Sequence, residues 1–168
     1  MSKTIDITAF DTNLGISYSK YASDKLGKDY WIVKKAFRYN LDGIGVQQVI
    51  VPKSYLTDGA SVPRPFWGFF PPWGRYGQAA VLHDWLCEYL GFWENSKDWN
   101  KISRKRCDQI FNEAMGDLGV NKFTRLAMYN AVNIYSHLSS TIYQTYDATK
   151  HEVELFLLEH YNKTGEWL

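Results

Sequence analysis

A segment rich in proline and aromatic residues, between Thr57 and Gly77, divides the sequence into two parts of different character. It holds four of the five prolines and four of the twelve glycines. Proline removes a backbone donor and glycine adds conformational freedom, so no regular helix or strand is expected there. The segment also carries six large aromatic side chains, which a flexible linker would not. We therefore expect either a rigid, packed loop or an aromatic surface for a partner.

The part before this segment has the pattern of strands. Residues Tyr30–Tyr39 mix β-branched and aromatic side chains with charged ones, as a half-exposed strand does. Turn residues follow at Asn40–Gly43, and Val46–Val51 is a second strand pattern, so a β-hairpin is expected. Residues Thr12–Tyr18 are a candidate short edge strand.

The part after the segment has helical spacing of apolar residues. One helix is expected over Tyr76–Leu90, followed by a polar loop through Asn95 and Asp98. Ser103 can cap a second helix that ends near Gly116–Gly119. Third and fourth helices are expected over about 122–146 and 152–162.

These patterns predict a single α+β domain. A small N-terminal antiparallel sheet or hairpin (1–56) precedes the loop (57–77), and a bundle of about four helices (78–162) follows it. A chain of 168 residues suits one domain with a core of its own.

Charge and cysteine content exclude several classes of protein. The formal net charge is +1, whereas nucleic-acid-binding proteins usually have a clear basic surplus, so no nucleic-acid partner is expected. Cys87 and Cys107 are too few for a disulfide framework and are expected to be buried. The first nine residues lack the apolar run of a secretory signal, and the longest uncharged run, 126–146, is too polar to span a membrane.

The first expected helix carries the most suggestive polar residues. Its apolar side chains cover most of its surface, so His83 and Asp84 lie on a nearly buried helix, about a third of a turn apart. His83 is a candidate base or metal ligand, and Asp84 a candidate metal ligand or orienting carboxylate. Alternatively, a backbone carbonyl satisfies His83 and Asp84 stabilises the helix N-terminus.

The second expected helix adds Asp108 at the edge of its apolar stripe. If the two helices pack together, Asp108 can face His83 and fix the tautomer of its imidazole, an arrangement that recurs in hydrolases and metal sites. The alternative is a salt bridge from Asp108 to Arg104 or Lys105.

The Pro-rich segment offers further candidates. Asp58 and Ser61 either form a turn with local backbone groups or reach the helix start near His83, where Asp58 could join Asp84 on a metal ion. Oxygen ligands favour calcium or magnesium over zinc. The remaining candidates belong to the possible docking surface: Arg64, Trp67, Trp73 and Tyr76.

Four sequence blocks in order resemble an uncharacterised family of tailed bacteriophages and prophages, a domain of unknown function. The blocks are T-D-G-A-S-V-P-R (57–64), P-P-W-G-R-Y (71–76), A-A-V-L-H-D-W-L (79–86) and D-Q-I-F-N-E-A-M (108–115). The resemblance covers about residues 30–135. It implies a phage origin, with the host cytoplasm or the virion as the location, and it implies no activity.

His83-Asp84 followed by a helix with Asp108 is also similar to phospholipases A2, above all the short parvoviral type. That resemblance implies that His83 activates a water, Asp84 binds calcium and Asp108 orients His83. The chain departs from the family at Cys87, where a tyrosine is usual, and it lacks an obvious glycine-rich calcium loop.

Two hypotheses follow from these residues. The first is a hydrolase, dependent on a divalent cation and acting on phospholipid or cell-wall material, with His83 as base. The second is a non-enzymatic virion or tail component, or an accessory protein that binds a host protein through the aromatic segment.

Overall fold

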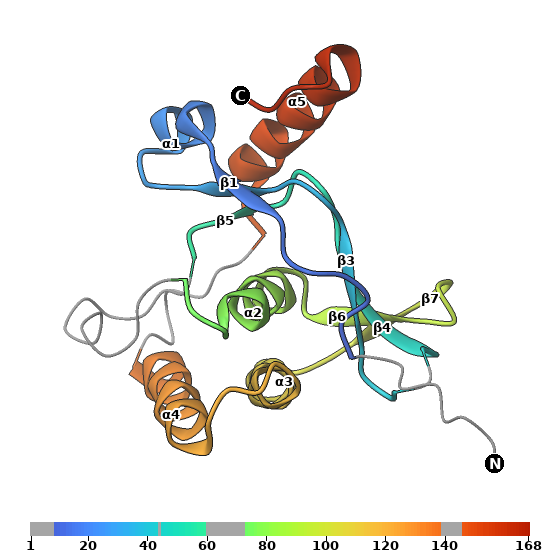
Figure 1. Cartoon of the computed structure of the whole chain (residues 1–168), viewed down its shortest axis with the longest axis vertical. Coiled ribbons are helices and arrows are strands. Elements are labelled where there is room, and N and C mark those ends of the chain that lie inside the picture. The colour runs from blue at the N-terminus through green and yellow to red at the C-terminus, as the bar shows by residue number, and fades with distance from the viewer. Residues whose placement is uncertain (1–8, 44, 60–72, 139–145) are drawn as a thin grey trace.

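The predicted α+β class is confirmed by the computed structural model, which describes residues 9–43, 45–59, 73–138 and 146–168 (Figure 1). Ser61, Arg64 and Trp67 lie outside the described residues. In the described parts, two antiparallel sheets pack with five helices, and α2 lies at the centre of the molecule.

The smaller sheet has three antiparallel strands in the order β1-β2-β5. The strands are β1 (Ile16–Tyr18), β2 (Trp31–Val33) and β5 (Leu56–Thr57). β1 lies at one edge of the sheet, as the sequence pattern predicted. The sequence did not predict the short helix α1 (Lys20–Leu26) between β1 and β2, although Ser19 caps its start and Gly27, at a φ of 75°, ends it.

The larger sheet has four antiparallel strands in the order β3-β4-β6-β7. The strands are β3 (Phe37–Asn40), β4 (Gln47–Val51), β6 (Gly91–Glu94) and β7 (Asp98–Lys101). β3 and β4 form the predicted hairpin, and the carboxylate of Asp42 accepts three backbone N–H groups in its turn.

Two strand predictions were wrong in detail. Tyr30–Tyr39 is not one strand, because the chain leaves the smaller sheet after Val33 and enters the larger one at Phe37. The predicted polar loop through Asn95 and Asp98 is instead the tip of a hairpin and the start of β7. Asn95 and Ser96 both have positive φ there, which the tight hairpin turn requires.

The four predicted C-terminal helices are all present. They are α2 (Gly77–Tyr89), α3 (Arg104–Asp117), α4 (Lys122–Leu138) and α5 (Ala148–Thr164). Ser103 caps α3 as predicted, and its hydroxyl accepts the N–H of Arg106. α4 ends at Leu138 in the described chain, where the sequence suggested about Tyr146. α5 begins four residues before the predicted start, because Asp147 caps it.

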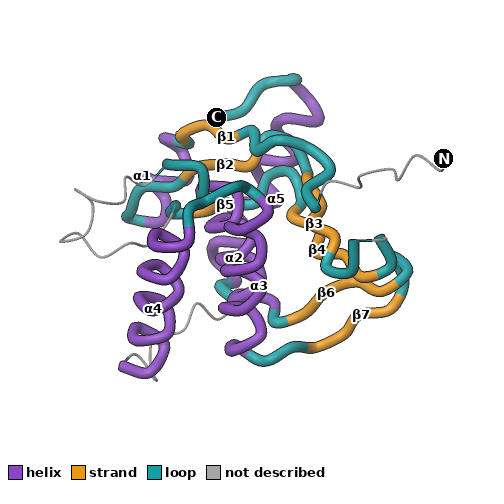
Figure 2. Tube along the Cα trace, turned by 60° about the horizontal axis from the view of Figure 1, so that its bottom comes forward, coloured by secondary structure: helices purple, strands orange, loops and turns teal. Residues whose placement is uncertain are grey.

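The helices divide into two groups around the sheets (Figure 1), and Figure 2 shows α4 beside the pair α2 and α3. α2 packs against α3, and α3 against α4. α5 does not join this group but packs with α1 beside the smaller sheet, where Tyr21 and Phe156 stack with ring centroids 4.9 Å apart. The residues that follow α5 are held in the same region, because the hydroxyl of Ser19 donates to a backbone oxygen of Leu168.

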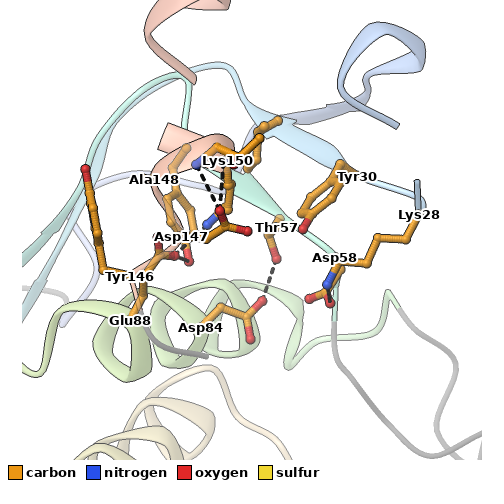
Figure 3. A pocket seen from close by; sticks show the side chains of 13 residues that line it. Lys28, Tyr30, Thr57, Asp58, Asp84, Glu88, Tyr146, Asp147, Ala148 and Lys150 are labelled. Atoms are coloured by element: carbon orange, nitrogen blue, oxygen red, sulfur yellow. Dashed lines mark hydrogen bonds and ion pairs between the residues drawn. The ribbon is translucent and has the colours of Figure 1, made fainter. Parts of the chain in front are cut away.

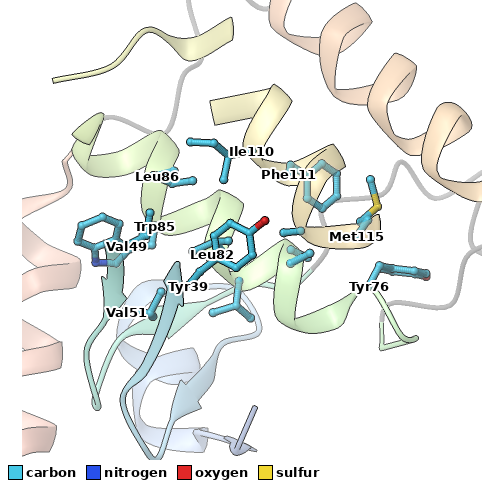
Figure 4. Close-up of a cluster of buried hydrophobic side chains, with 14 of the residues drawn as sticks. Tyr39, Val49, Val51, Tyr76, Leu82, Trp85, Leu86, Ile110, Phe111 and Met115 are labelled. Carbon is cyan, nitrogen blue, oxygen red and sulfur yellow. The ribbon is translucent and has the colours of Figure 1, made fainter. Parts of the chain in front are cut away.

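The main core lies between α2, α3 and the larger sheet (Figure 4). Leu82 and Leu86 of α2 pack there with Ile110 and Met115 of α3 and with Val49 of β4, and all five are fully buried. Every residue of α2 from Gly77 to Glu88 is buried, which confirms the prediction of a nearly buried helix.

The β6–β7 hairpin gives a test of this packing. A Cβ added at Gly91 would lie 2.3 Å from the ring of Trp99, whereas a Cβ at Gly15 would meet no atom within 4 Å. We expect Gly91→Ala to lower the free energy of unfolding by about 1–3 kcal/mol, because Trp99 would have to move. Denaturant unfolding measures the effect, and Gly15→Ala is the control. Equal stability of the two variants would contradict the described packing.

Candidate functional site

The buried helix α2 carries polar side chains on two of its faces. His83 and Cys87, one turn apart, face α3, whereas Asp84 and Glu88 face β5 and the beginning of α5. The difference follows from the 100° that separates consecutive residues on a helix. His83 and Asp84 therefore do not converge on one point, although they are neighbours in the sequence.

His83 and Asp108 form a direct contact between α2 and α3. His83 Nε2 lies 2.7 Å from Asp108 Oδ1, and the two residues are 7% and 1% exposed. Arg104, one turn before Asp108, brings its Nε to 3.5 Å from the same oxygen. The ring of Phe111 packs against the imidazole with the centroids 4.8 Å apart. The structure thus contains both the predicted His83–Asp108 contact and its alternative, the ion pair with Arg104.

Burial sets the protonation state of His83. It lowers the pKa of the imidazole below its usual range, and it outweighs the opposite effects of the hydrogen bond and the charge of Asp108. The imidazole is therefore neutral at neutral pH. A neutral imidazole has one N–H, which Nε2 donates to the carboxylate, and this leaves the lone pair on Nδ1. Asp108 fixes this tautomer, which is the form that a general base requires.

Cys87 and Cys107 are buried free thiols, as predicted, and they lie next to the His83–Asp108 pair. Cys87 Sγ lies 3.4 Å from His83 Nε2, and Cys107 donates to the carbonyl of Leu86 over 3.5 Å. Burial raises the pKa of Cys87 well above its usual value, so its thiolate is disfavoured. Because the thiolate is the nucleophilic form, Cys87 is poorly suited to attack a substrate.

Asp84 takes part in a separate arrangement with the end of β5. Thr57 Oγ1 donates to Asp84 Oδ2 over 2.6 Å, and Asp58 is bound to Lys28 Nζ at 2.7 Å. Burial and the negative charge of Asp58 raise the pKa of Asp84 well above its usual value. The alternative in which Asp84 stabilises the helix N-terminus is wrong, because Asp84 lies beyond the first turn of α2.

Asp84 and Asp58 line one pocket, as the metal-site prediction required. However, the described residues include no group of three or more His, Cys, Asp or Glu side chains placed to hold a metal ion. Asp58 is engaged by Lys28, and burial favours the protonated form of Asp84. The described residues therefore do not fit a divalent cation by themselves, and calcium or magnesium binding stays a prediction.

The pocket has a volume of about 460 Å³ and lies between α2, β5 and the beginning of α5 (Figure 3). Glu88 and Lys150 meet on its wall, with Nζ 2.5 Å from Oε2. The hydroxyl of Tyr55 donates to the same oxygen, and Glu154 lies 3.4 Å from the ammonium of Lys150. Glu154 also accepts the backbone N–H of Leu56, so this network fastens α5 to both α2 and β5.

The described end of the aromatic segment packs against the fold, whereas Phe66, Trp67, Phe69 and Phe70 lie outside the described residues, so the rigid loop and the docking surface both stay predictions. Tyr76 is buried in the main core, and Trp73 makes an edge contact with Trp31, with ring centroids 5.3 Å apart. The indole also lies against Gly59 and Gly77, where an added Cβ would be 3.3 Å from its ring. Tyr76 is therefore buried, and Trp73 is half-buried. No described helix is long and apolar enough to cross a membrane.

Comparison with known proteins places the chain in a family. Residues 31–132 match the family described as "Protein of unknown function (DUF1353)". The chain belongs to this family. The matched residues of the DUF1353 chain include α2 and α3, and therefore both His83 and Asp108. They exclude α1, Lys28 in the loop that follows it, and α5 with Lys150.

A relative in Sinorhizobium fredii (strain NBRC 101917 / NGR234), "Uncharacterized protein y4iH", is 33% identical over 106 residues. The aligned part is 60% of the DUF1353 chain and 38% of the relative, so the chain corresponds to well under half of that protein. No solved structure is significantly similar to the chain.

Sequence reasoning missed the second polar cluster, formed by Tyr55, Glu88, Lys150 and Glu154. Glu88 could have been found, because it lies one turn after Asp84 on a helix that is otherwise apolar. Lys150 and Glu154 have the spacing of an ordinary exposed ion pair on a helix. No signal in the sequence shows that this pair is buried against α2.

The protonation of His83 can be measured directly. We expect its pKa to lie below 6.5 in the wild type and to fall further in Asp108→Asn, because that substitution removes the charge that opposes the effect of burial. NMR titration of the histidine rings measures both values, and His160 on α5 is the internal control. An unchanged or higher His83 pKa in the variant would show that Asp108 does not act on the imidazole.

The burial of Asp84 predicts an unusual effect on stability. Its raised pKa means that the folded state holds the proton more tightly, so stability falls as the pH rises above the pKa of the unfolded chain. Asparagine carries no charge and still accepts from Thr57. We therefore expect Asp84→Asn to increase the free energy of unfolding at neutral pH by on the order of 1 kcal/mol.

The gain of Asp84→Asn should disappear near about pH 4, where the unfolded aspartate is protonated as well. Denaturant unfolding at several pH values measures it. The exposed Asp98, in β7, provides the control substitution Asp98→Asn, which should show no such pH-dependent gain. A loss of stability in Asp84→Asn at neutral pH would contradict the expectation.

Proposed function

We propose that the chain is a hydrolase in which His83 acts as a general base on a water molecule and Asp108 orients the imidazole. The observation that carries this proposal is the 2.7 Å contact between His83 Nε2 and the almost fully buried Asp108. A buried carboxylate on one ring nitrogen holds the other nitrogen as an acceptor, which is the requirement for general-base catalysis.

The chemistry follows from the assigned tautomer. His83 Nδ1 takes a proton from water while the oxygen attacks the carbonyl carbon of an ester or amide. The resulting imidazolium is stabilised by Asp108, and the proton then passes to the leaving group. Water is the preferred nucleophile because burial keeps Cys87 in the thiol form. His83 and Asp108 carry these proton transfers, and a divalent cation at Asp84 and Asp58 stays a separate prediction.

The substrate class and the biological setting rest on the resemblances of the sequence. We propose phospholipid or cell-wall material as the substrate and a phage or prophage as the origin. The similarity of His83-Asp84 and Asp108 to phospholipases A2 supports an ester of a lipid. The proposal of a docking protein has less support, because the described aromatic residues Trp73 and Tyr76 pack against the rest of the fold.

Hydrolysis assays on phospholipid vesicles and on purified peptidoglycan test the proposal. We expect His83→Ala to lower the rate on the true substrate by at least about 100-fold, which is the contribution of a general base. Asp108→Asn should also lower the rate, because the variant no longer stabilises the imidazolium. Circular dichroism would establish that both variants are folded.

The matched control is His160→Ala, which removes a partly exposed histidine on α5 and should keep the wild-type rate. If the wild type hydrolyses neither material, with or without added calcium, the proposed activity is excluded for these substrates. Full activity of His83→Ala would exclude His83 as the base.

A further inference from the structure

The pocket between α2, β5 and the beginning of α5 contains charged groups that the His83–Asp108 pair does not use. Carboxylates outnumber ammonium groups on its wall. The acidic residues are Asp58, Asp84, Glu88 and Asp147, and the basic residues are Lys28 and Lys150. Even with Asp84 protonated, as its burial favours, three carboxylates face two ammonium groups, so the pocket has an excess of negative charge that favours a cationic ligand.

Both lysines of the pocket are already paired. Lys28 Nζ lies 2.7 Å from Asp58, and Lys150 Nζ lies 2.5 Å from Glu88 and 3.4 Å from Glu154. Lys150 thus has two carboxylate partners for one positive charge. Both lysines are thus held by other carboxylates of the protein, and neither is ion-paired with Asp84 among the described residues.

Glu88 has a buried acceptor that needs a donor. Its side chain is 4% exposed, and its Oε2 receives both Lys150 and the hydroxyl of Tyr55. The other oxygen, Oε1, is buried without a hydrogen-bond partner among the described residues. An unpaired buried acceptor is unfavourable, and more so when it is charged. A donor group on a ligand in the pocket would remove this penalty.

Lys150 shows how the pocket wall accommodates an ammonium group. Its Nζ binds the Glu88 carboxylate and also lies 4.0 Å from the centroid of the Tyr55 ring. A carboxylate combined with a tyrosine ring is a favourable environment for an organic cation. Tyr30 and Tyr146 line the same pocket and extend this environment (Figure 3).

We propose that this pocket binds a small polar molecule through a protonated primary amine, which donates to Glu88 Oε1 and to the carboxylate of Asp84. A volume of about 460 Å³ is suitable for a ligand of the size of an amino sugar or a short alkyl amine. An ammonium group fits better than a divalent metal ion, because it needs hydrogen-bond acceptors in place of a cluster of three or more ligands. The site is separate from His83, which faces α3.

Binding should be linked to the proton on Asp84. Burial, together with the charge of Asp58, raises the pKa of this carboxyl, while Thr57, Lys150 and Lys28 act in the opposite direction. Tyr55 and Glu88 also face the pocket. An ammonium beside Asp84 favours the ionised carboxylate, so binding releases a proton. The affinity for the amine therefore rises as the pH increases through the pKa of Asp84.

Matched pairs of probes test the proposal by calorimetry on the full chain. The pairs are glucosamine with glucose and n-butylamine with n-butanol, which differ in the amine. We expect at least one amine to bind about tenfold or more tightly than its neutral partner, since a charge-assisted hydrogen bond contributes this much. The affinity for n-butylamine should increase as the pH rises above the ordinary range of an aspartate pKa, because the pKa of Asp84 is raised.

Asp84→Asn is the decisive variant, because it should stay folded and still lose most of the amine affinity, by about tenfold. Glu88→Gln should lose affinity as well, and Asp98→Asn should bind as the wild type does. Equal binding of amines and neutral partners, or the absence of amine binding, would overturn the proposal. Binding of calcium without binding of amines would overturn it in favour of a metal site. None of these measurements depends on hydrolysis, so they stand apart from the test of His83.

Discussion

The burial of α2 is the constraint on which the rest of the structure depends. The helix lies at the centre of the molecule, with α3 on one side and both sheets and α5 around the remainder, and every residue from Gly77 to Glu88 is buried. Such a helix can carry polar side chains only where a neighbouring element supplies a partner. α3 supplies Asp108 to His83, β5 supplies Thr57 to Asp84, and α5 supplies Lys150 to Glu88.

Burial shifts the pKa values of His83 and Asp84 in opposite directions. Desolvation favours neutral forms, so it lowers the pKa of His83 and raises that of Asp84. The pair on the α3 side thereby has the protonation state of a base. The opposite side holds the Asp84 carboxyl, whose raised pKa means that it keeps its proton to a higher pH than an exposed aspartate does. His83 and Asp84 are neighbours in the sequence, but α2 directs the imidazole toward α3 and the carboxyl toward β5.

Features that arise from local periodicity could be predicted from the sequence. Features that depend on contacts with residues far away in the sequence could not. The four C-terminal helices, the β3–β4 hairpin and the cap at Ser103 follow from patterns within a few residues. The contact of His83 with Asp108 was also predictable, because each lies at the edge of an apolar stripe. The break of 30–39 into two strands depends on which sheet each half joins, and the hairpin at Asn95 depends on positive φ values in polar residues. Lys150 and Glu154 have the spacing of a solvated pair, and only the packing of α5 buries them.

The position of α5 also has an evolutionary consequence. The family match, 31–132, contains both members of the His83–Asp108 pair, whereas the pocket combines Asp84 and Glu88 from inside the match with Lys28 and Lys150 from outside it. The matched segment thus supplies α2 and the β5 side of the pocket, whereas the residues outside it supply Lys28 and the beginning of α5. Under the proposed amine binding, divergence at the two ends of the chain would change the selectivity of the pocket and leave the His83–Asp108 pair intact.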